Sequence, residues 1–202
     1  MSKISLPNVT LAIVDCVDYN RAKLSFEHCK ACADFGATKF LTSLPVNESS
    51  VVKIPHIGSI AAYSEFMVKH LANYFDTEFV MVVQWDGFIW HPELWEDEFL
   101  AYDYIGAPWP TDLLYPGIPK YFTVGNGGFS IRSKRLQDFM RDDPNIILHK
   151  AEDVAICQYN RPYLEKCGFT YAPEDVARRF SLENGPLVPR FGAHARIKLV
   201  RG

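Results

Sequence analysis

An acidic residue stands directly after one of the most apolar stretches of the sequence. Asp86 follows the run Glu78–Val83 and lies in the segment Gln84-Trp85-Asp86-Gly87. A carboxylate just past the end of a buried strand can reach a hard divalent cation, and a glycine beside it lets a phosphate approach the backbone. The alternative is an aspartate that only shapes a turn. The segment is compatible with metal-assisted chemistry on a phosphate-bearing substrate.

A glycine cluster follows forty residues later, at Gly125-Asn126-Gly127-Gly128. Glycines spaced this closely suit a ligand that lies against the backbone, with amide groups available to its oxygen atoms. The alternative is a tight turn with a bulge. The cluster is neither a P-loop nor a dinucleotide-binding fingerprint, because the residues that complete those motifs do not follow it.

Two further places carry side chains suited to catalysis. Glu152 and Asp153 open a helical pattern, where one of them can serve as a general base; the spacing alone favours a helix cap. His194 ends the segment Phe191-Gly192-Ala193-His194, and a histidine beside small residues can bend back over a site and bind a metal. Only its neighbours distinguish it from the other histidines.

The first half of the chain alternates between strand and helix patterns. We expect strands at Val9–Val14, Thr38–Thr42 and Glu78–Val83, and helices from about Asn20 to Phe35 and over Gly58–Tyr74. This order predicts βαβ units in a parallel sheet that is covered by helices on both faces. Ligands bind at the carboxyl ends of strands in such sheets, which directs attention to residues 15–18 and 84–88.

The second half is less regular. Residues 102–128 are rich in glycine and proline and predict loops and short strands, and helices resume near Lys134–Met140 and Glu152–Cys167. We expect one domain over residues 1–202, with a nucleotide-binding half to about residue 100 and an acceptor and catalytic half after it. Further domains of a longer chain can follow.

Composition excludes several classes of protein. The chain has 202 residues, of which 48% are hydrophobic and 22% charged, and its net charge is -3 with scattered lysines and arginines. These values predict a folded protein that does not bind nucleic acid. We find no apolar run that could span a membrane and no signal peptide, and therefore expect a soluble cytoplasmic protein. Cys29 and Cys32 lie in a helical pattern without further metal ligands, which favours a structural role.

Taken in order, these segments resemble a family of small GT-A type glycosyltransferases. The resemblance extends from about Val9 to His194, and its most specific parts are the strings YDYIGAPW (102–109) and GNGGFSIR (125–132). It implies a GT-A fold, a nucleotide-diphosphate sugar donor (usually a UDP-sugar) and manganese or magnesium as cofactor. It also implies an oligosaccharide or glycoprotein glycan as acceptor. For a viral member, the expected compartment is the host cytoplasm.

The resemblance also implies roles for individual residues. Asp86 occupies the last position of the Asp-x-Asp metal motif, and His194 resembles the histidine that completes the metal shell. Gln84 stands at the first position of that motif, so one expected oxygen ligand is missing. Asp153 resembles the base that deprotonates the acceptor hydroxyl in inverting enzymes. Glu152 and Trp109 are implied on the acceptor side, Glu152 with helix capping as its alternative and Trp109 with burial in the core.

Donor-binding residues are implied on both halves of the chain. The uracil and ribose are expected at Asp15, Cys16 and Val17, with Ser64 and Lys69 closing over the base and Gln84 and Trp85 beside the donor. Gly127 and Gly128 are expected to let the sugar lie against the backbone. The expected reaction moves a hexose or deoxyhexose, of the glucose or rhamnose type, with inversion. The alternatives are a sugar nucleotidyltransferase and a non-catalytic module that binds nucleotide sugars or carbohydrates.

Overall fold

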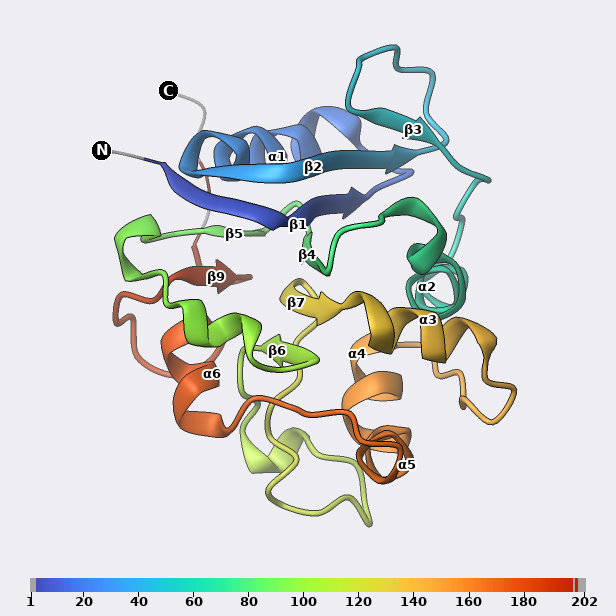
Figure 1. The fold of residues 1–202 in the computed structure, drawn as a ribbon, viewed down its shortest axis with the longest axis vertical. Coiled ribbons are helices and arrows are strands. Elements are labelled where there is room, and N and C mark those ends of the chain that lie inside the picture. The colour runs from blue at the N-terminus through green and yellow to red at the C-terminus, as the bar shows by residue number, and fades with distance from the viewer. Residues whose placement is uncertain (1–2, 198, 200–202) are drawn as a thin grey trace.

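The computed structural model describes residues 3–197 and 199, and a six-stranded sheet is its central element (Figure 1). The strand order is β3-β2-β1-β4-β7-β6. The first four strands are parallel to one another, and β7 is antiparallel to both of its neighbours, β4 and β6. A smaller sheet has the order β5-β9-β8. The strands are β1 (Ile4–Val14), β2 (Ala33–Thr42), β3 (Val51–Lys53), β4 (Phe79–Val83), β5 (Gly87–Ile89), β6 (Tyr104–Gly106), β7 (Phe129–Ser133), β8 (Ser181–Leu182) and β9 (Gly192–His194).

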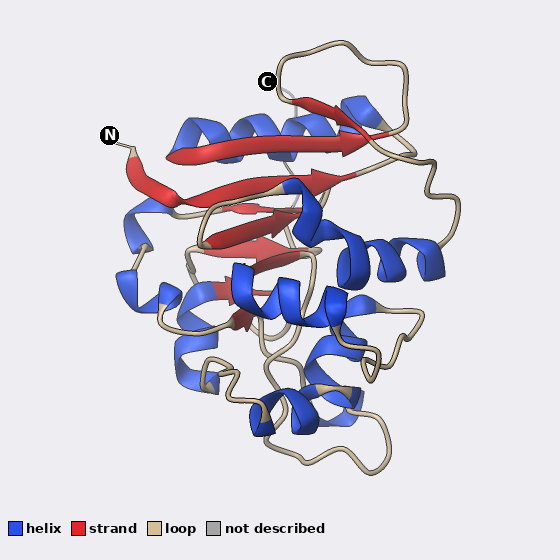
Figure 2. Ribbon diagram, turned by 45° about the vertical axis from the view of Figure 1, so that its right-hand side comes forward, coloured by secondary structure: helices blue, strands red, loops and turns tan. Residues whose placement is uncertain are grey.

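Helices cover both faces of the large sheet, as the sequence predicts (Figure 2). Alternate residues of β1 point to opposite faces. Leu11 and Ile13 pack with α1 and α6, and Ala12 and Val14 pack with the helical residues 60–74, which we call the α2 segment. The helices are α1 (Tyr19–Cys32), α2 (Ile60–Glu65), α3 (Lys134–Asp142), α4 (Glu152–Val154), α5 (Arg161–Lys166) and α6 (Glu174–Phe180). Short 3-10 helices span Pro92–Leu94, Asp97–Leu100 and Thr111–Leu113.

Two predicted helices differ from the observed ones at their ends and in continuity. The helix expected over Gly58–Tyr74 begins after its cap Ser59 as α2, and continues as a π-helical segment (Phe66–His70) and a 3-10 turn (Leu71–Tyr74). The helix expected over Glu152–Cys167 is divided into α4, a π-helical segment (Ala155–Tyr159) and α5. Asn160 separates the last two, because its side chain donates to the carbonyls of Ile147 and Ala155.

In the connection from β1 to β2, the helix is shorter and the strands are longer than the sequence predicts. α1 ends at Cys32 and not at Phe35, because Ala33–Phe35 pair in parallel with Ile4–Leu6 at the start of β1. The pairing shifts register after Leu6, and Gly36 lies at this irregularity, where a Cβ would stand 2.0 Å from the carbonyl oxygen of Pro7. The extra pairing lengthens both strands beyond the predicted Val9–Val14 and Thr38–Thr42.

Helix α1 carries Cys29 and Cys32, and it places Cys29 in the core. Burial raises the pKa of its thiol to about 12, and its sulfur accepts a hydrogen bond from the Ile89 amide at 3.4 Å. These contacts agree with a structural role for this cysteine. In the part of the chain that the structure describes, no helix has both the length and the apolar character needed to cross a membrane.

Replacing Gly36 with alanine is expected to destabilise the sheet by about 1–3 kcal/mol, because the new methyl group overlaps backbone that cannot move freely. Urea unfolding should show a lower midpoint with an unchanged slope. Gly58→Ala is the matched control, since its methyl group meets only the ring of His56, at 3.2 Å. Equal midpoints for the two variants would contradict this account of the irregularity.

Candidate active site

The carboxyl ends of β1 and β4 open into a cleft with a volume of about 970 Å³. We call it the central cleft. Residues from α2 and α4 also line this cleft. Its lining residues are Val14–Val17, Arg21, His56–Ile60, Tyr63, Gln84, Trp85 and Ala151–Asp153. The cleft therefore joins both strand ends that the sequence indicated with the Glu152–Asp153 pair from the second half.

Near β1 the cleft has an apolar rim, which Val17 and Ile60 form. Val17 is 78% exposed and Ile60 is 74% exposed, so two large apolar side chains flank the opening. The Asp15 carboxylate accepts the amide hydrogens of Val17, at 2.7 Å, and Asp18, at 2.9 Å, which fixes the loop after β1. Cys16 is buried, and its sulfur accepts from the Ser43 amide at 3.4 Å. The rim has the chemistry to receive a flat, partly apolar group.

Gln84 and Trp85 lie on the other side of this rim. The side-chain nitrogen of Gln84 (Nε2) donates to the Tyr63 hydroxyl at 3.1 Å. Trp85 is 39% exposed, and the Arg21 guanidinium lies 4.2 Å from the centroid of its ring. Both residues assigned from sequence thus face the central cleft.

Asp153 is held at the inner end of the cleft by backbone amides. One carboxylate oxygen accepts from the Gly127 amide at 3.2 Å and the other from the Val154 amide at 2.8 Å. Glu152 points deeper and faces the fully buried guanidinium of Arg132 at 3.3 Å. It makes no helix cap, so the capping alternative for Glu152 is wrong. Burial and the adjacent Asp153 raise the pKa of Glu152, and Arg132 opposes this change.

His194, the last residue of β9, lies between the carboxylates of Asp86 and Glu183. Its Nε2 atom is 3.4 Å from Asp86 Oδ1, and its Nδ1 atom is 3.3 Å from Glu183 Oε1. Burial lowers the pKa of His194, but the two carboxylates outweigh burial and raise it to about 9. Asn126, whose φ is 27°, donates to the same Glu183 oxygen at 2.7 Å.

The glycine cluster makes room for these side chains. A Cβ on Gly127 would stand 2.1 Å from Glu152 Oε1, and a Cβ on Gly128 would stand 2.2 Å from His194 Nε2. The space expected for a sugar at these two glycines is therefore occupied on that side by protein. Because Gly127 and Gly128 are consecutive, their close contacts bring the Glu152–Asp153 pair and the Asp86–His194 pair to one short backbone segment.

The residues around His194 supply some, but not all, of the ligands that a divalent cation needs. Asp86 Oδ1 is buried and has no hydrogen-bond partner, and it faces Nε2 of His194. Glu183 faces the other ring nitrogen, as a carboxylate that orients a metal-binding histidine does. Within residues 3–197 and 199, no three histidine, cysteine or acidic side chains are placed to hold a metal. Two protein donors fit an ion that takes its remaining ligands from phosphate and water.

Ser64 and Lys69 lie outside the lining of the central cleft. The Ser64 hydroxyl donates to the His149 carbonyl at 2.5 Å. The Lys69 ammonium donates to the carbonyls of Met140 and Asp143, at 2.7 and 2.8 Å, at the end of α3. Both side chains connect the α2 segment to residues 140–149, and this favours a structural role over contact with the donor.

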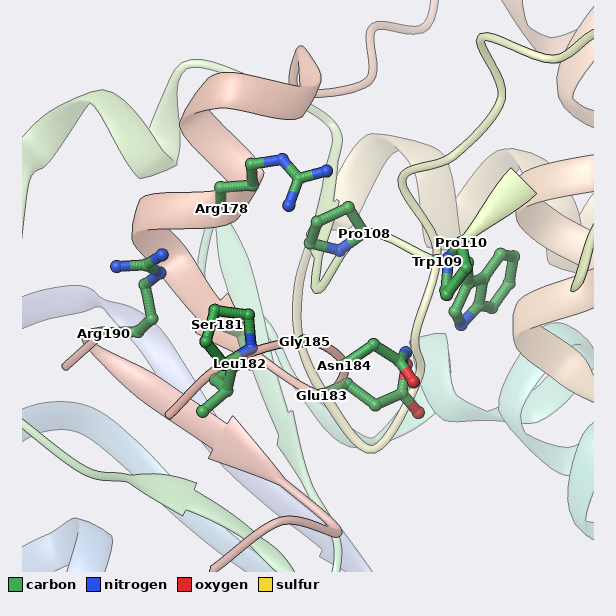
Figure 3. Close-up of a pocket in the computed structure, with 11 residues that line it drawn as sticks. Pro108, Trp109, Pro110, Arg178, Ser181, Leu182, Glu183, Asn184, Gly185 and Arg190 are labelled. Carbon is green, nitrogen blue, oxygen red and sulfur yellow. The ribbon is translucent and has the colours of Figure 1, made fainter. Parts of the chain in front are cut away.

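A second cavity of about 230 Å³ contains Trp109 (Figure 3). It is lined by Pro108–Pro110, Arg178, Ser181–Pro186 and Arg190, and Figure 3 shows the two arginines on one side and Trp109 on the other. Trp109 is 9% exposed and packs its ring against Gly125, so most of its surface belongs to the core. Glu183 connects this cavity to His194.

Sequence reasoning missed four residues of this arrangement, which are Arg21, Asn126, Arg132 and Glu183. Asn126 and Arg132 belong to the GNGGFSIR string, and the string could have indicated them. Arg21 and Glu183 lie outside every motif, and only the folded chain brings them to the site.

Comparisons with known proteins agree with this fold. A family model described as "Protein of unknown function (DUF5672)" matches residues 48–194, whereas no curated protein matches the sequence. The galactosyltransferase LgtC, solved with donor and acceptor sugar analogs, is 14% identical with a TM-score of 0.50; the match covers 92% of this chain and 86% of LgtC. This likeness confirms the expected α/β fold of GT-A type.

Two other solved structures are similar at lower scores. A glycosyltransferase involved in glycosylation of the major capsid of PBCV-1 is 11% identical with a TM-score of 0.49, over 93% of this chain and 92% of that one. The bifunctional IspDF from Campylobacter jejuni is 10% identical with a TM-score of 0.48; the match covers 81% of this chain and 48% of IspDF, so this chain spans about half of its length. A specific relation to the amino-terminal glycosyltransferase domain of a chlorella-virus multidomain protein, suggested by the sequence strings, stays a prediction.

Replacing Arg132 with methionine is expected to destabilise the protein by about 3–5 kcal/mol, because Glu152 is then left as a buried, unpaired charge. The double variant Arg132→Met, Glu152→Leu should recover much of this loss, which chemical unfolding measures. Arg141→Met removes an arginine from partly exposed surface ion pairs with Asp138 and Asp142, and should cost much less stability than Arg132→Met. A double variant that is no more stable than Arg132→Met would contradict the pairing.

Proposed function

Because the chain belongs to the family described as "Protein of unknown function (DUF5672)", whose description names no reaction, we propose a function from the site itself. The protein is a metal-dependent glycosyltransferase. It moves a hexose or deoxyhexose, of the glucose or rhamnose type, from a UDP-sugar to a hydroxyl of an oligosaccharide or glycoprotein glycan, with inversion. The observation that carries this proposal is the meeting of Asp153 and the Asp86–His194 pair at Gly127 and Gly128.

The central cleft supports a nucleotide-sugar donor. Its lining has exposed apolar side chains at Val17 and Ile60 for a base, and it includes Asp15 for the polar edge of a nucleoside. Its inner end holds Asp153, next to the backbone at Gly127. A donor that enters base first at β1 places its sugar toward the only catalytic carboxylate that the resemblance implied.

Asp153 is the proposed base. Its carboxylate takes the proton of the acceptor hydroxyl while the acceptor oxygen bonds to the anomeric carbon and the bond to the diphosphate breaks. Two backbone amides hold the carboxylate in place, which keeps it aimed without a further side chain. A single displacement of this kind inverts the anomeric centre. UDP leaves with the electrons of the broken bond.

Asp86 and His194 are the proposed ligands of manganese or magnesium. The bound cation would neutralise charge on the leaving diphosphate. Glu183 orients the imidazole so that Nε2 faces Asp86. Binding to this nitrogen requires the neutral imidazole, so His194 must give up a proton that it otherwise holds up to a pKa of about 9.

The acceptor is proposed to reach the site from the side of the second cavity. Trp109 and Glu183 both line this cavity, and Glu183 touches His194. Trp109 contributes only the exposed edge of its ring to such an acceptor. Glu152, which lines the central cleft from beneath, positions Asp153 through its pair with Arg132.

Asp153→Asn is expected to lower the rate of UDP release by about 100-fold or more, because it removes the base and keeps the shape of the side chain. The assay incubates UDP-glucose, UDP-galactose, UDP-rhamnose and UDP-N-acetylglucosamine with Mn²⁺ and measures free UDP, with water in the place of the acceptor hydroxyl as the group that Asp153 deprotonates. Binding of UDP, measured by calorimetry, should stay unchanged. Asp175→Asn, whose side chain is exposed on the outer face of α6, is the control and should match the wild type.

Two results would contradict the proposal, one from a parallel incubation with UTP and a sugar phosphate and one from this assay. Release of pyrophosphate from UTP and a sugar phosphate, without turnover of UDP-sugars, would favour a nucleotidyltransferase. Binding of a UDP-sugar without turnover at high manganese would favour a non-catalytic module.

Asp86→Asn is expected to weaken Mn²⁺ binding in the presence of UDP by about tenfold or more, because it replaces a charged ligand by a neutral one. The fraction of free Mn²⁺, followed by electron paramagnetic resonance, measures this change without turnover. Asp97→Asn serves as the control, because Asp97 lies on the 3-10 helix Asp97–Leu100 and its carboxylate accepts a hydrogen bond from Trp95 at 2.9 Å. Equal Mn²⁺ affinity in the wild type and Asp86→Asn would exclude Asp86 as a ligand.

A further inference from the structure

The central cleft has an excess of negative charge for a ligand that is itself an anion. Three acidic residues line it, Asp15, Glu152 and Asp153, and Arg132 balances Glu152 from behind. A nucleoside diphosphate adds further negative charge. Gln84, at the position where the resemblance implies a metal-binding carboxylate, supplies a neutral amide. Donor binding therefore needs positive charge from the protein or from a bound cation.

Arg21 is the one arginine or lysine among the residues that line the central cleft. It lies in the first turn of α1, directly after the loop that follows β1. The Asp18 side chain accepts its backbone amide hydrogen at 3.0 Å, so the helix start is capped without use of the guanidinium. Across residues 3–197 and 199, the ion pairs include none with Arg21. Its charge is available to a ligand.

Trp85 holds this guanidinium at the cleft. The guanidinium carbon lies 4.2 Å from the centroid of the Trp85 ring, and both side chains line the same wall. Stacking on an aromatic face leaves the N–H groups at the edge of the guanidinium plane free to bind oxygen atoms. Arginine binds phosphate through two parallel hydrogen bonds, which a lysine cannot reproduce. Trp85 in turn stands between Gln84 and the proposed metal ligand Asp86.

We propose that Arg21, stacked on Trp85, binds the diphosphate of the donor and stabilises its charge as UDP leaves. The inference rests on the proposed function, since it takes the donor to be a nucleoside diphosphate sugar. Arg21 then supplies from α1 part of the positive charge that a full Asp-x-Asp metal site would hold. Trp85 is a positioning residue in this arrangement, because it acts through the guanidinium.

Calorimetric titration of the full chain with uridine, UMP and UDP tests this role, in EDTA and again with Mn²⁺. In EDTA, the wild type should bind UDP more tightly than uridine, and Arg21→Gln should weaken UDP binding by roughly tenfold to a hundredfold. Uridine affinity should not change, because the nucleoside carries no phosphate. The UDP affinity of Arg21→Lys should fall between those of the wild type and Arg21→Gln, since lysine keeps the charge and loses the paired hydrogen bonds.

Lys23→Gln is the matched control. It removes the same charge from the same helix, but Lys23 pairs with Glu48 at 2.7 Å and does not line the cleft. UDP should also change the tryptophan fluorescence of the wild type, and Trp85→Phe should abolish this change. The fluorescence places the bound nucleotide beside Trp85 independently of affinity, and a change that UDP causes and uridine does not assigns it to the diphosphate.

The outcomes separate this inference from the proposed function. If UDP binds the wild type and Arg21→Gln equally well, or if Lys23→Gln weakens UDP binding as much as Arg21→Gln does, the role of Arg21 is overturned while nucleotide binding stands. If the wild type binds neither uridine nor UDP with or without Mn²⁺, the proposed function fails and this inference fails with it.

Discussion

The candidate site depends on the close approach of protein side chains to two consecutive glycines. Glu152 packs against Gly127 and His194 packs against Gly128, at separations that any side chain on either glycine would prevent. The two residues come from α4 and β9, which no local sequence relation connects. The segment leading into β7 therefore acts as the spacer that sets how far the base candidate lies from the metal candidates. Gly127 adds an amide that fixes Asp153 directly.

The buried Arg132–Glu152 pair supports this segment from below. Arg132 lies on β7, whose antiparallel pairing with β4 is in register from Phe79–Ser133 to Val83–Phe129. The strand thus carries Arg132 to a fixed depth beneath the cleft, and Glu152 must follow it. Such pairs cost desolvation energy and add little stability compared with apolar residues. In this structure, the pair holds Glu152 and Asp153, at the start of α4, in one position.

The sequence predicts the parts of this fold that follow from local pattern. The apolar runs of β1 and β4 are typical of strands buried on both faces, and the rule for parallel sheets correctly placed Asp15, Gln84 and Trp85 at the cleft. Long-range pairing was not predictable in this way. Ala33–Phe35 continue a helical pattern and join a strand only because Ile4–Leu6 are beside them. The small sheet of β5, β9 and β8 joins residues about a hundred positions apart.

The candidate site shows the same division. Motifs identified Asp86, Asp153 and His194, but not the partners that determine what each can do. Glu183 orients His194, Arg132 neutralises Glu152, and Arg21 supplies charge to the cleft, yet each is an unremarkable charged residue in the sequence. The glycines were interpreted as space for a ligand because sequence shows that room exists and not which group fills it.

Gln84 gives these contacts a common physical explanation. A carboxylate at this position would face Asp15, Glu152 and Asp153 in one cleft, and repulsion among them would oppose the binding of a diphosphate. The neutral amide removes this repulsion and donates a hydrogen bond to Tyr63. It also removes a ligand from any cation at Asp86 and His194. Under the proposed function, such a site would bind its donor with positive charge divided between two places, a cation held by few protein ligands and a guanidinium fixed on an aromatic ring.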